Sequence, residues 1–399
     1  MKKRILVSGG WGYRNLGDDA ILISTIKILK RDYPNSDIVI TSYNPIESLK
    51  CVKKSILSEV EIIPSIQRII FGYTLQYIFI TPIVWNTFFK IKYHLWNIFH
   101  KNKIEFYYYL LEKHPRILRW ILSLLYKKIE KQFKDIDLFI MSGGGYLNES
   151  HECNIGHFLE IEWAKKKGIP IYLIGQTIGP FENKRTKSLV QRYLSLSDKI
   201  IVRDLESQEE LEHLGIKVDE HITPDLAIYD TSIYKGVRSY ITIIPFFGIH
   251  NRINEIIEVI EELVNTTGKK VLITISQQWT IPQKYAETIY KELEKRNIDT
   301  TYKIPKNVME LQDLLCKSYI VLSQNLHGLI MSYRVGTKII SLNDKRKFQT
   351  FISQTFENGK CFNIESFNKE ELLNYCMNII NDRIINKDRN NIIKQISLK

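Results

Sequence analysis

The sequence predicts an α/β protein with two domains, each built from parallel strands that alternate with helices. Three observations predict this class. Short apolar runs of strand length alternate with longer segments of helical periodicity along most of the chain. Loops rich in glycine or charge follow several of these runs, which is typical of the ligand-binding edge of a parallel sheet. The length of 399 residues, with 44% hydrophobic and 25% charged residues, fits two or three globular domains.

The first expected strand and helix enclose a glycine-rich turn. Residues 5–8 form a short apolar strand, and apolar side chains recur at helical spacing over residues 20–30. The turn between them reads GGWGYRNLGDD, where backbone amides and a helix N-terminus can receive an anion or a sugar. It has neither the glycine spacing of the dinucleotide fingerprint nor the GKS or GKT of a P-loop. The alternative is a tight turn in which Asp18 caps the helix.

Four further strands are expected in the first domain. They are apolar runs at residues 37–42, 137–141, 169–174 and 199–202. Each of the last three runs into a loop rich in glycine or charge, namely SGGGY, GQTIGP or RDLES, and then into a plausible helix. Because the carboxyl ends of parallel strands meet at one edge of a sheet, these loops are expected to share a site there.

One segment supplies most of the basic character. Residues 68–134 contain twelve Lys or Arg and three acidic residues, and so contribute +9 of the net charge of +12. They also hold 17 of the 45 aromatic residues. We expect residues 66–133 to be a helical insertion in the first domain, with Trp, Tyr and Lys suited to an anionic membrane surface. The alternative is a helical subdomain packed on the protein itself.

Part of this insertion is long enough to span a bilayer. Residues 69–89 carry no charge over 21 residues. A single span would place the first strand and the rest of the sheet on opposite sides of the membrane. A returning span over residues 104–126 would have to bury five charged residues, which is costly. The sequence therefore favours helices that lie on a membrane surface over helices that cross it.

The second half of the chain repeats the alternation of strands and helices. Residues 226–238 are interpreted as a linker, so that the domains cover residues 1–225 and 239–385. The second domain is expected to begin with a strand at residues 240–244. A basic tail at residues 386–399 is expected to be surface-bound or mobile. Other expected elements are helices at 251–264, 282–296, 307–317 and 367–379 and a strand at 270–275.

The most informative stretch is residues 319–351, a βαβ unit. A buried strand at residues 320–323 opens into a polar loop, His327 lies in the first turn of the next helix, and a second strand leads to the basic residues 345–347. A titratable imidazole at a helix start, with lysines arriving from the next strand end, suits an anionic ligand. The alternative is a loop histidine with solvated lysines.

The cysteines and the N-terminus predict a cytoplasmic protein. Residues 1–4 run directly into an apolar strand that is too short for the core of a signal peptide. Five widely spaced cysteines form no CxxC pair, which favours a reducing compartment: Cys51, Cys153, Cys316, Cys361 and Cys376.

Other chemistries have weaker support in the sequence. Residues 151–153, His-Glu-Cys, together with His157 have soft-ligand composition, but they lack a second cluster, so no metal is expected. Ser8 and Ser142 do not lie in a GxSxG setting, which argues against a serine hydrolase. The basic and aromatic segment could stack nucleic-acid bases, but its long apolar runs favour lipid or protein, so no nucleic acid is expected.

Six motifs, in order along the chain, resemble the polysaccharide pyruvyl transferase family. They are GGWGYRNLGDDAIL, SGGGYLNES, GQTIGPF, VRDLES, TPDLA and LSQNLHGLIMSYRVGTKIISLNDKRKF, and the resemblance covers most of the chain outside roughly residues 50–135. It implies two Rossmann-like domains facing a cleft, as in B-type glycosyltransferases. It also implies a transferase with phosphoenolpyruvate as co-substrate and no cofactor. The acceptor would be a sugar with two free hydroxyls, and the product a cyclic ketal on a cell-envelope exopolysaccharide or its lipid-linked precursor at the inner face of the membrane.

The resemblance also implies residue roles. Phosphoenolpyruvate carries a phosphate and a carboxylate, which need cations, and ketal formation needs a general acid and base. His327 matches the motif histidine and is the expected acid or base. Arg203, Lys347, Lys345 and Asn325 are the expected contacts to the donor anions. The acceptor is expected to be held, and the cleft completed, by Gly10, Asn15, Gly17, Asp18, Gly144, Gly145 and Gln176.

One position departs from the family pattern. The family commonly has arginine two residues before the motif histidine, and here that residue is Asn325, which can hydrogen-bond but supplies no charge. Lys345, Arg346 or Arg334 could supply the charge instead. The alternatives are a glycosyltransferase of the same architecture that uses a nucleotide sugar, or a glycan-assembly protein that has lost its activity.

Overall fold

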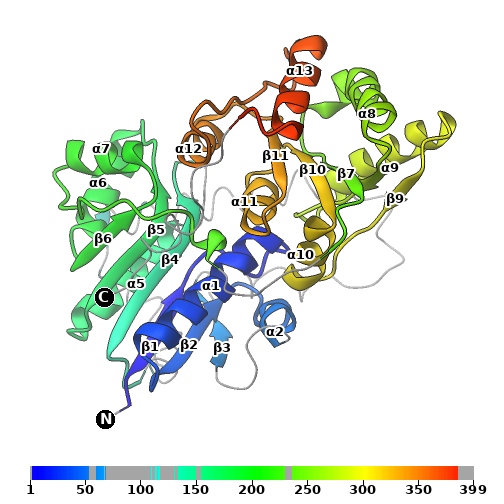
Figure 1. Cartoon of the computed structure of the whole chain (residues 1–399). Helices are drawn as coiled ribbons and strands as arrows, with labels where there is room; N and C mark the ends of the chain where they lie inside the picture. The colour runs from blue at the N-terminus through cyan, green and yellow to red at the C-terminus, as the bar shows by residue number, and fades with distance from the viewer. Residues whose placement is uncertain are drawn as a thin grey trace, which may run out of the picture. The chain divides into compact units, whose positions relative to one another are not determined.

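A computed structural model describes most of the chain outside the expected insertion and tail. Its described residues are 2–53, 60–66, 68, 109, 113–114, 116, 130, 134–149, 154–229 and 236–384. The chain forms two compact units, each with its own sheet (Figure 1). The first unit comprises Met1–Gly10, Tyr33–Pro45 and Glu59–Ile222, and the second comprises Trp11–Asp32, Ile46–Ser58 and Thr223–Lys399.

The first unit contains a six-stranded parallel sheet. Its strand order is β3-β2-β1-β4-β5-β6, so the chain starts near the middle and builds outward in both directions. Outside the edge strand β3, most strand residues are buried, as expected for parallel strands that carry helices. The strands are β1 (Arg4–Ser8), β2 (Asp37–Ser42), β3 (Val60–Pro64), β4 (Leu138–Leu147), β5 (Ile171–Ile178) and β6 (Lys199–Val202), and the helices are α5 (Asn154–Lys166), α6 (Lys184–Leu194) and α7 (Leu205–His213).

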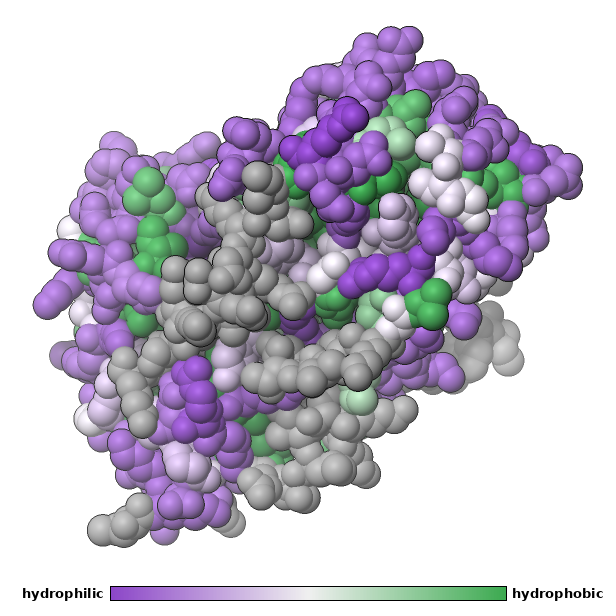
Figure 2. All heavy atoms as spheres, in the orientation of Figure 1, coloured by the Kyte–Doolittle hydropathy of each residue, from purple (hydrophilic) through white to green (hydrophobic). Residues whose placement is uncertain are grey.

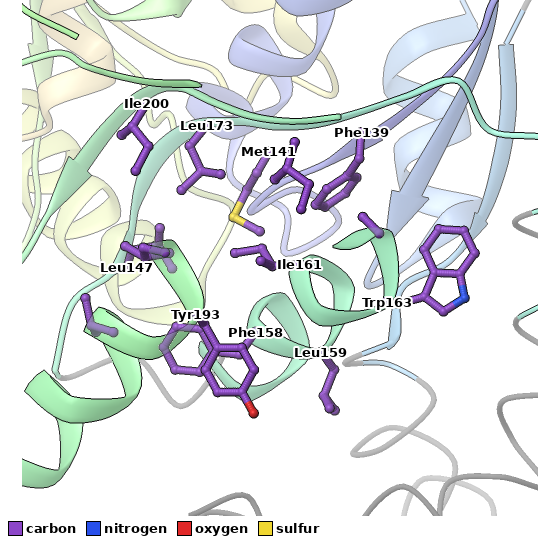
Figure 3. Close-up of a cluster of buried hydrophobic side chains, with 14 of the residues drawn as sticks. Phe139, Met141, Leu147, Phe158, Leu159, Ile161, Trp163, Leu173, Tyr193 and Ile200 are labelled. Atoms are coloured by element: carbon purple, nitrogen blue, oxygen red, sulfur yellow. The ribbon is translucent and has the colours of Figure 1, made fainter. Parts of the chain in front are cut away.

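A core between α5, α6 and the sheet holds the first unit together. Figure 3 shows Phe139 and Met141 of β4 facing the side chains of α5. The rings of Phe158 on α5 and Tyr193 on α6 stack with centroids 5.0 Å apart. Burial of one large apolar side chain stabilises a fold by roughly 1.5–3 kcal/mol, so this layer fixes the sheet whose strand ends carry the polar loops.

The second unit contains a five-stranded parallel sheet in the order β11-β10-β7-β8-β9. Its strands are β7 (Tyr240–Ile244), β8 (Lys270–Ile273), β9 (Thr300–Tyr302), β10 (Ser318–Ser323) and β11 (Lys338–Ser341). The helices that follow them are α8 (Ile253–Thr267), α9 (Thr280–Lys295), α10 (Val308–Cys316), α11 (Leu326–Arg334), α12 (Arg346–Thr355) and α13 (Lys369–Ile380), with short 3-10 helices η3 (Leu226–Ile228) and η4 (Ile249–Arg252).

Helix α1 (Leu16–Asp32) groups with the second unit, although it follows β1 directly. It packs on η3, α10 and α11. Two hydrogen bonds fix it there: Leu16 N donates to the Ser276 carbonyl at 2.9 Å, and Ser24 Oγ donates to the Tyr229 carbonyl at 2.5 Å. The single domain boundary expected near residue 225 therefore differs from the observed grouping, in which α1 and most of α2 (Pro45–Lys53) belong to the later unit.

The α/β class with two parallel sheets is confirmed, with three local differences. The expected loops SGGGY and GQTIGP lie largely within strands, because β4 continues to Leu147 and β5 to Ile178. The expected linker begins with the buried helix η3, which the Asp225 side chain caps by accepting from Ala227 N at 2.9 Å. Strands β3 and β9 were not expected, since each is short and partly exposed.

The basic and aromatic segment at residues 66–133 lies almost wholly outside the described residues, as does the tail at residues 386–399, so the expected helical insertion and its contact with a membrane stay predictions. Among the helices that are described, none has both the length and the hydropathy needed to cross a membrane. On the face drawn in Figure 2, hydrophilic residues cover most of the surface formed by the described residues, with smaller hydrophobic patches between them.

Candidate functional site

In the first unit, the carboxyl ends of β5 and β6 present an arginine in a fixed position. Arg203 follows β6 directly and is only 7% exposed. Its Nε donates to Thr177 Oγ1 at 2.7 Å. A β-carbon on Gly145 of β4 would lie 3.6 Å from its Nη2, which is ordinary van der Waals contact. The structure thus places Gly145 and Arg203, both expected in the site, next to each other.

The residues that follow Arg203 build the start of α7. The Asp204 side chain caps the helix, accepting from Ser207 N at 2.9 Å and from Ser207 Oγ at 2.5 Å. Its other oxygen accepts from Thr177 Oγ1 at 2.6 Å, and Ser207 Oγ accepts from Ile178 N at 2.8 Å. In this motif the aspartate and the serine therefore fix the loop, while the arginine supplies the charge.

Tyr146 supports the glycine-rich loops of the same unit. Its hydroxyl donates to the Ser142 carbonyl at 3.0 Å and accepts from Gln176 Nε2 at 2.8 Å. A β-carbon on Gly10 or on Gly144 would lie 3.0 Å from its ring, so both positions favour glycine. No described residue donates to the buried Gln176 Oε1. The expected residues Gly10, Gly144 and Gln176 thus surround one tyrosine.

A buried polar cluster lies beneath this tyrosine. His157 Nδ1 is 3.1 Å from Glu160 Oε2, which accepts from Ser8 Oγ at 2.5 Å, and the imidazole lies 4.6 Å from the Tyr146 ring between centroids. His157 is therefore partnered by a carboxylate of its own helix. Residues 151–153 lie outside the described part of the chain, and the described residues contain no group of three or more side chains that could hold a metal ion.

Glu149 ties the β4 loop to the loop before α6. Its carboxylate accepts from Glu182 N at 2.8 Å and from Asn183 N at 2.9 Å. These backbone hydrogen bonds, that from Glu182 first, lower the pKa of Glu149 below its usual value because they stabilise the charged form. The SGGGYLNE and GQTIGPF motifs are thus joined by an ionised side chain.

In the second unit, His327 lies in the first turn of α11 and packs against the first turn of α1. A β-carbon on Gly17 would lie 2.0 Å from both Cγ and Nδ1 of the imidazole and 2.4 Å from its Cβ. No side chain fits at that distance, so residue 17 has to be glycine for the histidine to lie where it does. The two motifs are more than 300 residues apart in sequence and meet at this contact.

Asn15 and Asp18 hold the turn beneath the histidine. Asn15 Nδ2 donates to Asp18 Oδ2 at 2.7 Å, and Asn15 Oδ1 accepts from Gly17 N at 3.2 Å. The backbone of Asn15 also forms an isolated antiparallel β-bridge with Gln277, which follows β8. The structure therefore groups the expected acceptor residues Asn15, Gly17 and Asp18 with the expected acid or base His327 in one unit.

Asn325, which stands where the family commonly has arginine, caps α11. Its Oδ1 accepts from Gly328 N at 3.1 Å, and its own N donates to Ser323 Oγ at 3.0 Å. The side chain is almost fully buried. This amide oxygen thus accepts a hydrogen bond from the first turn of the helix, a structural role that the sequence did not reveal.

The remaining cations divide into two kinds. Arg334 is buried and its Nη1 donates to the Ala227 carbonyl at 2.9 Å, so it joins α11 to η3. Lys345 and Lys347 are exposed at the start of α12, and Lys347 Nζ lies 5.8 Å from the centre of the Phe348 ring. Of the described residues at this helix start, none caps it with a side chain, so its amides and these lysines form a positive surface.

Sequence reasoning missed several residues that position the site. Thr177 and Tyr146 stand next to expected site residues within the same motifs, and their signal was a polar or aromatic side chain in the stretch that follows an apolar run. Gln324, almost fully buried before Asn325, binds the backbone of Phe246 and of Phe247. Periodicity cannot reveal such contacts, because they join loops that are distant in sequence.

Comparison with known proteins gives a family and a fold. A family model described as "Polysaccharide pyruvyl transferase" matches residues 15–346. No curated protein matches the chain in sequence.

Solved structures of similar fold include two UDP-GlcNAc 2-epimerases and a third sugar-binding protein. The epimerase from Methanocaldococcus jannaschii is 12% identical with a TM-score of 0.58, covering 97% of this chain and 95% of that one. The epimerase from Neisseria meningitidis, solved with UDP-GlcNAc, is 13% identical with a TM-score of 0.53, covering 100% and 95%. HepE of Anabaena, solved with UDP and glucose, is 10% identical with a TM-score of 0.55, covering 98% of each chain. At such identities the likeness shows the fold alone, which is that of two Rossmann-like domains as in B-type glycosyltransferases.

The contact between Gly17 and His327 predicts a coupled effect on stability. Gly17→Ala is expected to lower the free energy of unfolding by about 1–3 kcal/mol, because the new methyl overlaps the histidine side chain. In a His327→Gly background, which also removes the interfering Cβ, the same change is expected to cost far less. Urea unfolding of the four proteins measures the coupling. Gly145→Ala is the matched control, since its β-carbon would meet nothing closer than 3.6 Å. Equal costs in both backgrounds would contradict the contact.

The cap of α11 predicts a contrast between two substitutions of Asn325. Asn325→Ala removes the acceptor for Gly328 N and is expected to lower the free energy of unfolding by about 0.5–2 kcal/mol. Asn325→Asp keeps an acceptor oxygen at that place and is expected to stay near the wild type. Chemical unfolding of both variants checks this, and an alanine variant as stable as the aspartate variant would refute the capping role.

Proposed function

Because the chain belongs to the polysaccharide pyruvyl transferase family, we propose that it transfers a pyruvyl group from phosphoenolpyruvate to two hydroxyls of a sugar. The product is a cyclic ketal on a surface glycan or its lipid-linked precursor. Membership makes the protein a transferase. The observation that carries the proposal is the grouping of His327 with the Asn15 to Asp18 turn, which lies within the matched region and brings an imidazole close to side chains that are able to bind sugar hydroxyls.

The donor requires cations for a phosphate and a carboxylate. Arg203 offers a nearly buried guanidinium whose orientation is fixed by the hydrogen bond from its Nε to Thr177, and a guanidinium is the group that best matches a phosphate or a carboxylate. Lys345 and Lys347 offer point charges beside the amides at the start of α12. Asn325 supplies at most an amide nitrogen, since its oxygen caps α11.

The reaction requires proton transfer at two places. A proton is added to the terminal carbon of the enol, which becomes a methyl group and leaves an oxocarbenium-like centre at the neighbouring carbon. The two sugar hydroxyls add to that carbon in turn, each losing its proton, as the bond to phosphate breaks. We assign His327 as the group that takes up or gives these protons, because a histidine titrates near neutral pH.

The acceptor requires groups that donate and accept hydrogen bonds. Asp18 and Asn15 can bind sugar hydroxyls through the turn that already joins them. In the first unit Gln176 offers a buried amide oxygen, and Gly10 and Gly144 allow the Tyr146 ring, whose hydroxyl accepts from Gln176, to lie close to their backbone. This assignment supports a polar sugar rather than an apolar acceptor.

A second candidate function is a glycosyltransferase that uses a nucleotide sugar. It is favoured by the use of Asn325 as a cap in place of a cationic contact, and it is compatible with the fold. A protein of the same fold without activity is the third candidate. Binding of UDP without binding of phosphoenolpyruvate would favour the second over the first, and binding of neither would favour the third.

Calorimetry tests the donor. The wild type is expected to bind phosphoenolpyruvate, and Arg203→Ala is expected to weaken binding by about 10- to 100-fold, because charge-assisted hydrogen bonds are lost. Arg192→Ala is the matched control, an exposed arginine on α6 of the same unit, and is expected to bind like the wild type. An Arg203→Ala variant with unchanged affinity, or a wild type that does not bind at millimolar donor, would overturn the assignment.

Release of phosphate tests the histidine. With phosphoenolpyruvate and a mixture of hexoses and N-acetylhexosamines as acceptors, His327→Ala is expected to release phosphate about 10²–10⁴-fold more slowly than the wild type. His213→Ala, which removes an exposed histidine at the end of α7, serves as the control. Calorimetry on the same variant separates a loss of chemistry from a loss of binding. Phosphate release by His327→Ala at the wild-type rate would mean that another group moves the protons.

A further inference from the structure

Three aromatic rings form an exposed ledge at the carboxyl ends of β7 and β8 in the second unit. The aromatic ledge consists of Phe246 and Phe247, which follow β7, and Trp279, which follows β8. The ring centroids of Phe246 and Phe247 are 4.5 Å apart, and those of Phe246 and Trp279 are 6.4 Å apart. Phe247 is 47% exposed and Trp279 is 39% exposed. Large rings exposed side by side commonly mark a binding surface.

Hydrogen bonds to neighbouring loops hold the aromatic ledge rigidly. Gln324 Oε1 accepts from Phe246 N at 2.6 Å, and its Nε2 donates to the Phe247 carbonyl at 3.0 Å, so one amide clamps the loop that carries both rings. Trp279 Nε1 donates to the Tyr13 carbonyl at 3.0 Å, which fixes the indole. Rings that are fixed before a ligand arrives lose little conformational freedom on binding.

The two segments that hydrogen-bond to the aromatic ledge, at Gln324 and at Tyr13, lie next in sequence to candidate site residues. Gln324 precedes the cap residue Asn325 and is three residues from His327. Tyr13 is two residues from Asn15, and the residue between them, Arg14, has a left-handed backbone with φ of 59° while its carbonyl accepts from Gln278 N at 3.0 Å. Backbone strain of this kind persists where the surrounding structure enforces it, often at a ligand site. The ledge and the histidine are thus parts of one loop cluster.

We propose that the aromatic ledge binds the sugar ring of the acceptor, an inference that rests on the proposed function. A pyranose has one face of C–H groups, which is apolar and stacks on the negative face of an aromatic ring. Its rim of hydroxyls needs polar partners. Asn15 lies in the loop that Trp279 contacts, and Asp18, in the first turn of α1, is hydrogen-bonded to it. The rings of the ledge are tilted to one another by 48° and 86°, which suits the uneven face of a sugar better than a flat nucleobase.

Saturation-transfer NMR on the full chain tests the aromatic ledge. The probes are glucose, galactose, mannose and their N-acetylhexosamine counterparts, with UDP as the competing ligand. At least one sugar is expected to bind the wild type, and Trp279→Ala is expected to weaken its binding about three- to tenfold through the lost stacking. Trp279→Phe, which keeps an aromatic face, is expected to retain most of the affinity. Ile281→Ala is the control, an exposed apolar residue two positions along the chain without an aromatic ring.

The outcomes separate the ledge from the proposed function. The inference is overturned if no probe sugar binds the wild type, or if Trp279→Ala and Phe247→Ala bind sugar like the wild type. It is also overturned if Trp279→Ala weakens the binding of UDP but of none of the sugars. Thermal unfolding shows whether the alanine variants are folded, and Trp279→Phe gives a second readout if they are not. Phosphoenolpyruvate affinity is expected to stay unchanged in Trp279→Phe. If sugar binding depends on Trp279 but the protein does not bind phosphoenolpyruvate, the ledge is a sugar-binding surface and the proposed donor is wrong.

Discussion

The close approach of the His327 side chain to the backbone of Gly17 is the constraint on which the site of the second unit depends. Any β-carbon at residue 17 would overlap the imidazole, so the packing of α1 on α11 is possible only with glycine there. Both helices also pack on η3. Ser24 of α1 and Arg334 of α11 each donate to a backbone carbonyl in or beside that short helix. The histidine and the turn beneath it are therefore placed by the same packing.

The polar residues of the six motifs are of two kinds: some are placed where they could bind a ligand, and others hydrogen-bond to the backbone and fix the loops. Asp204 and Asn325 cap α7 and α11, and each stands within two residues of a side chain to which the proposed function assigns a role, Arg203 or His327. The sequence could name these loops as a site, because they follow strands. It could not separate caps from ligands, because Asn and Asp serve both roles equally well and only the folded loop shows which donor lies nearby.

The two sheets and most of their strands could be predicted because buried parallel strands are apolar throughout and end in polar loops. The grouping of α1 with the second unit could not, since it depends on contacts such as that of Leu16 N with the Ser276 carbonyl, which join segments 260 residues apart. The continuation of β4 through three glycines to Leu147 was equally hidden, because glycine in a sequence predicts a turn. In both cases tertiary contacts prevailed over local preference.

The positions of the cationic side chains bear on how the proposed donor, phosphoenolpyruvate, could be bound. A donor with a phosphate and a carboxylate needs more positive charge than one arginine supplies, and the place of the usual second arginine is taken by the cap Asn325. Arg334 is not a substitute, because its guanidinium is buried and bound to the Ala227 carbonyl, and moving it would leave a buried charge and release α11 from η3. Lys345 and Arg346 are exposed at the start of α12, where the helix amides add to their positive charge. Under the proposed function, asparagine at position 325 therefore assigns part of the donor binding to the start of α12, where flexible side chains contribute charge but little of the fixed geometry that a buried arginine would give.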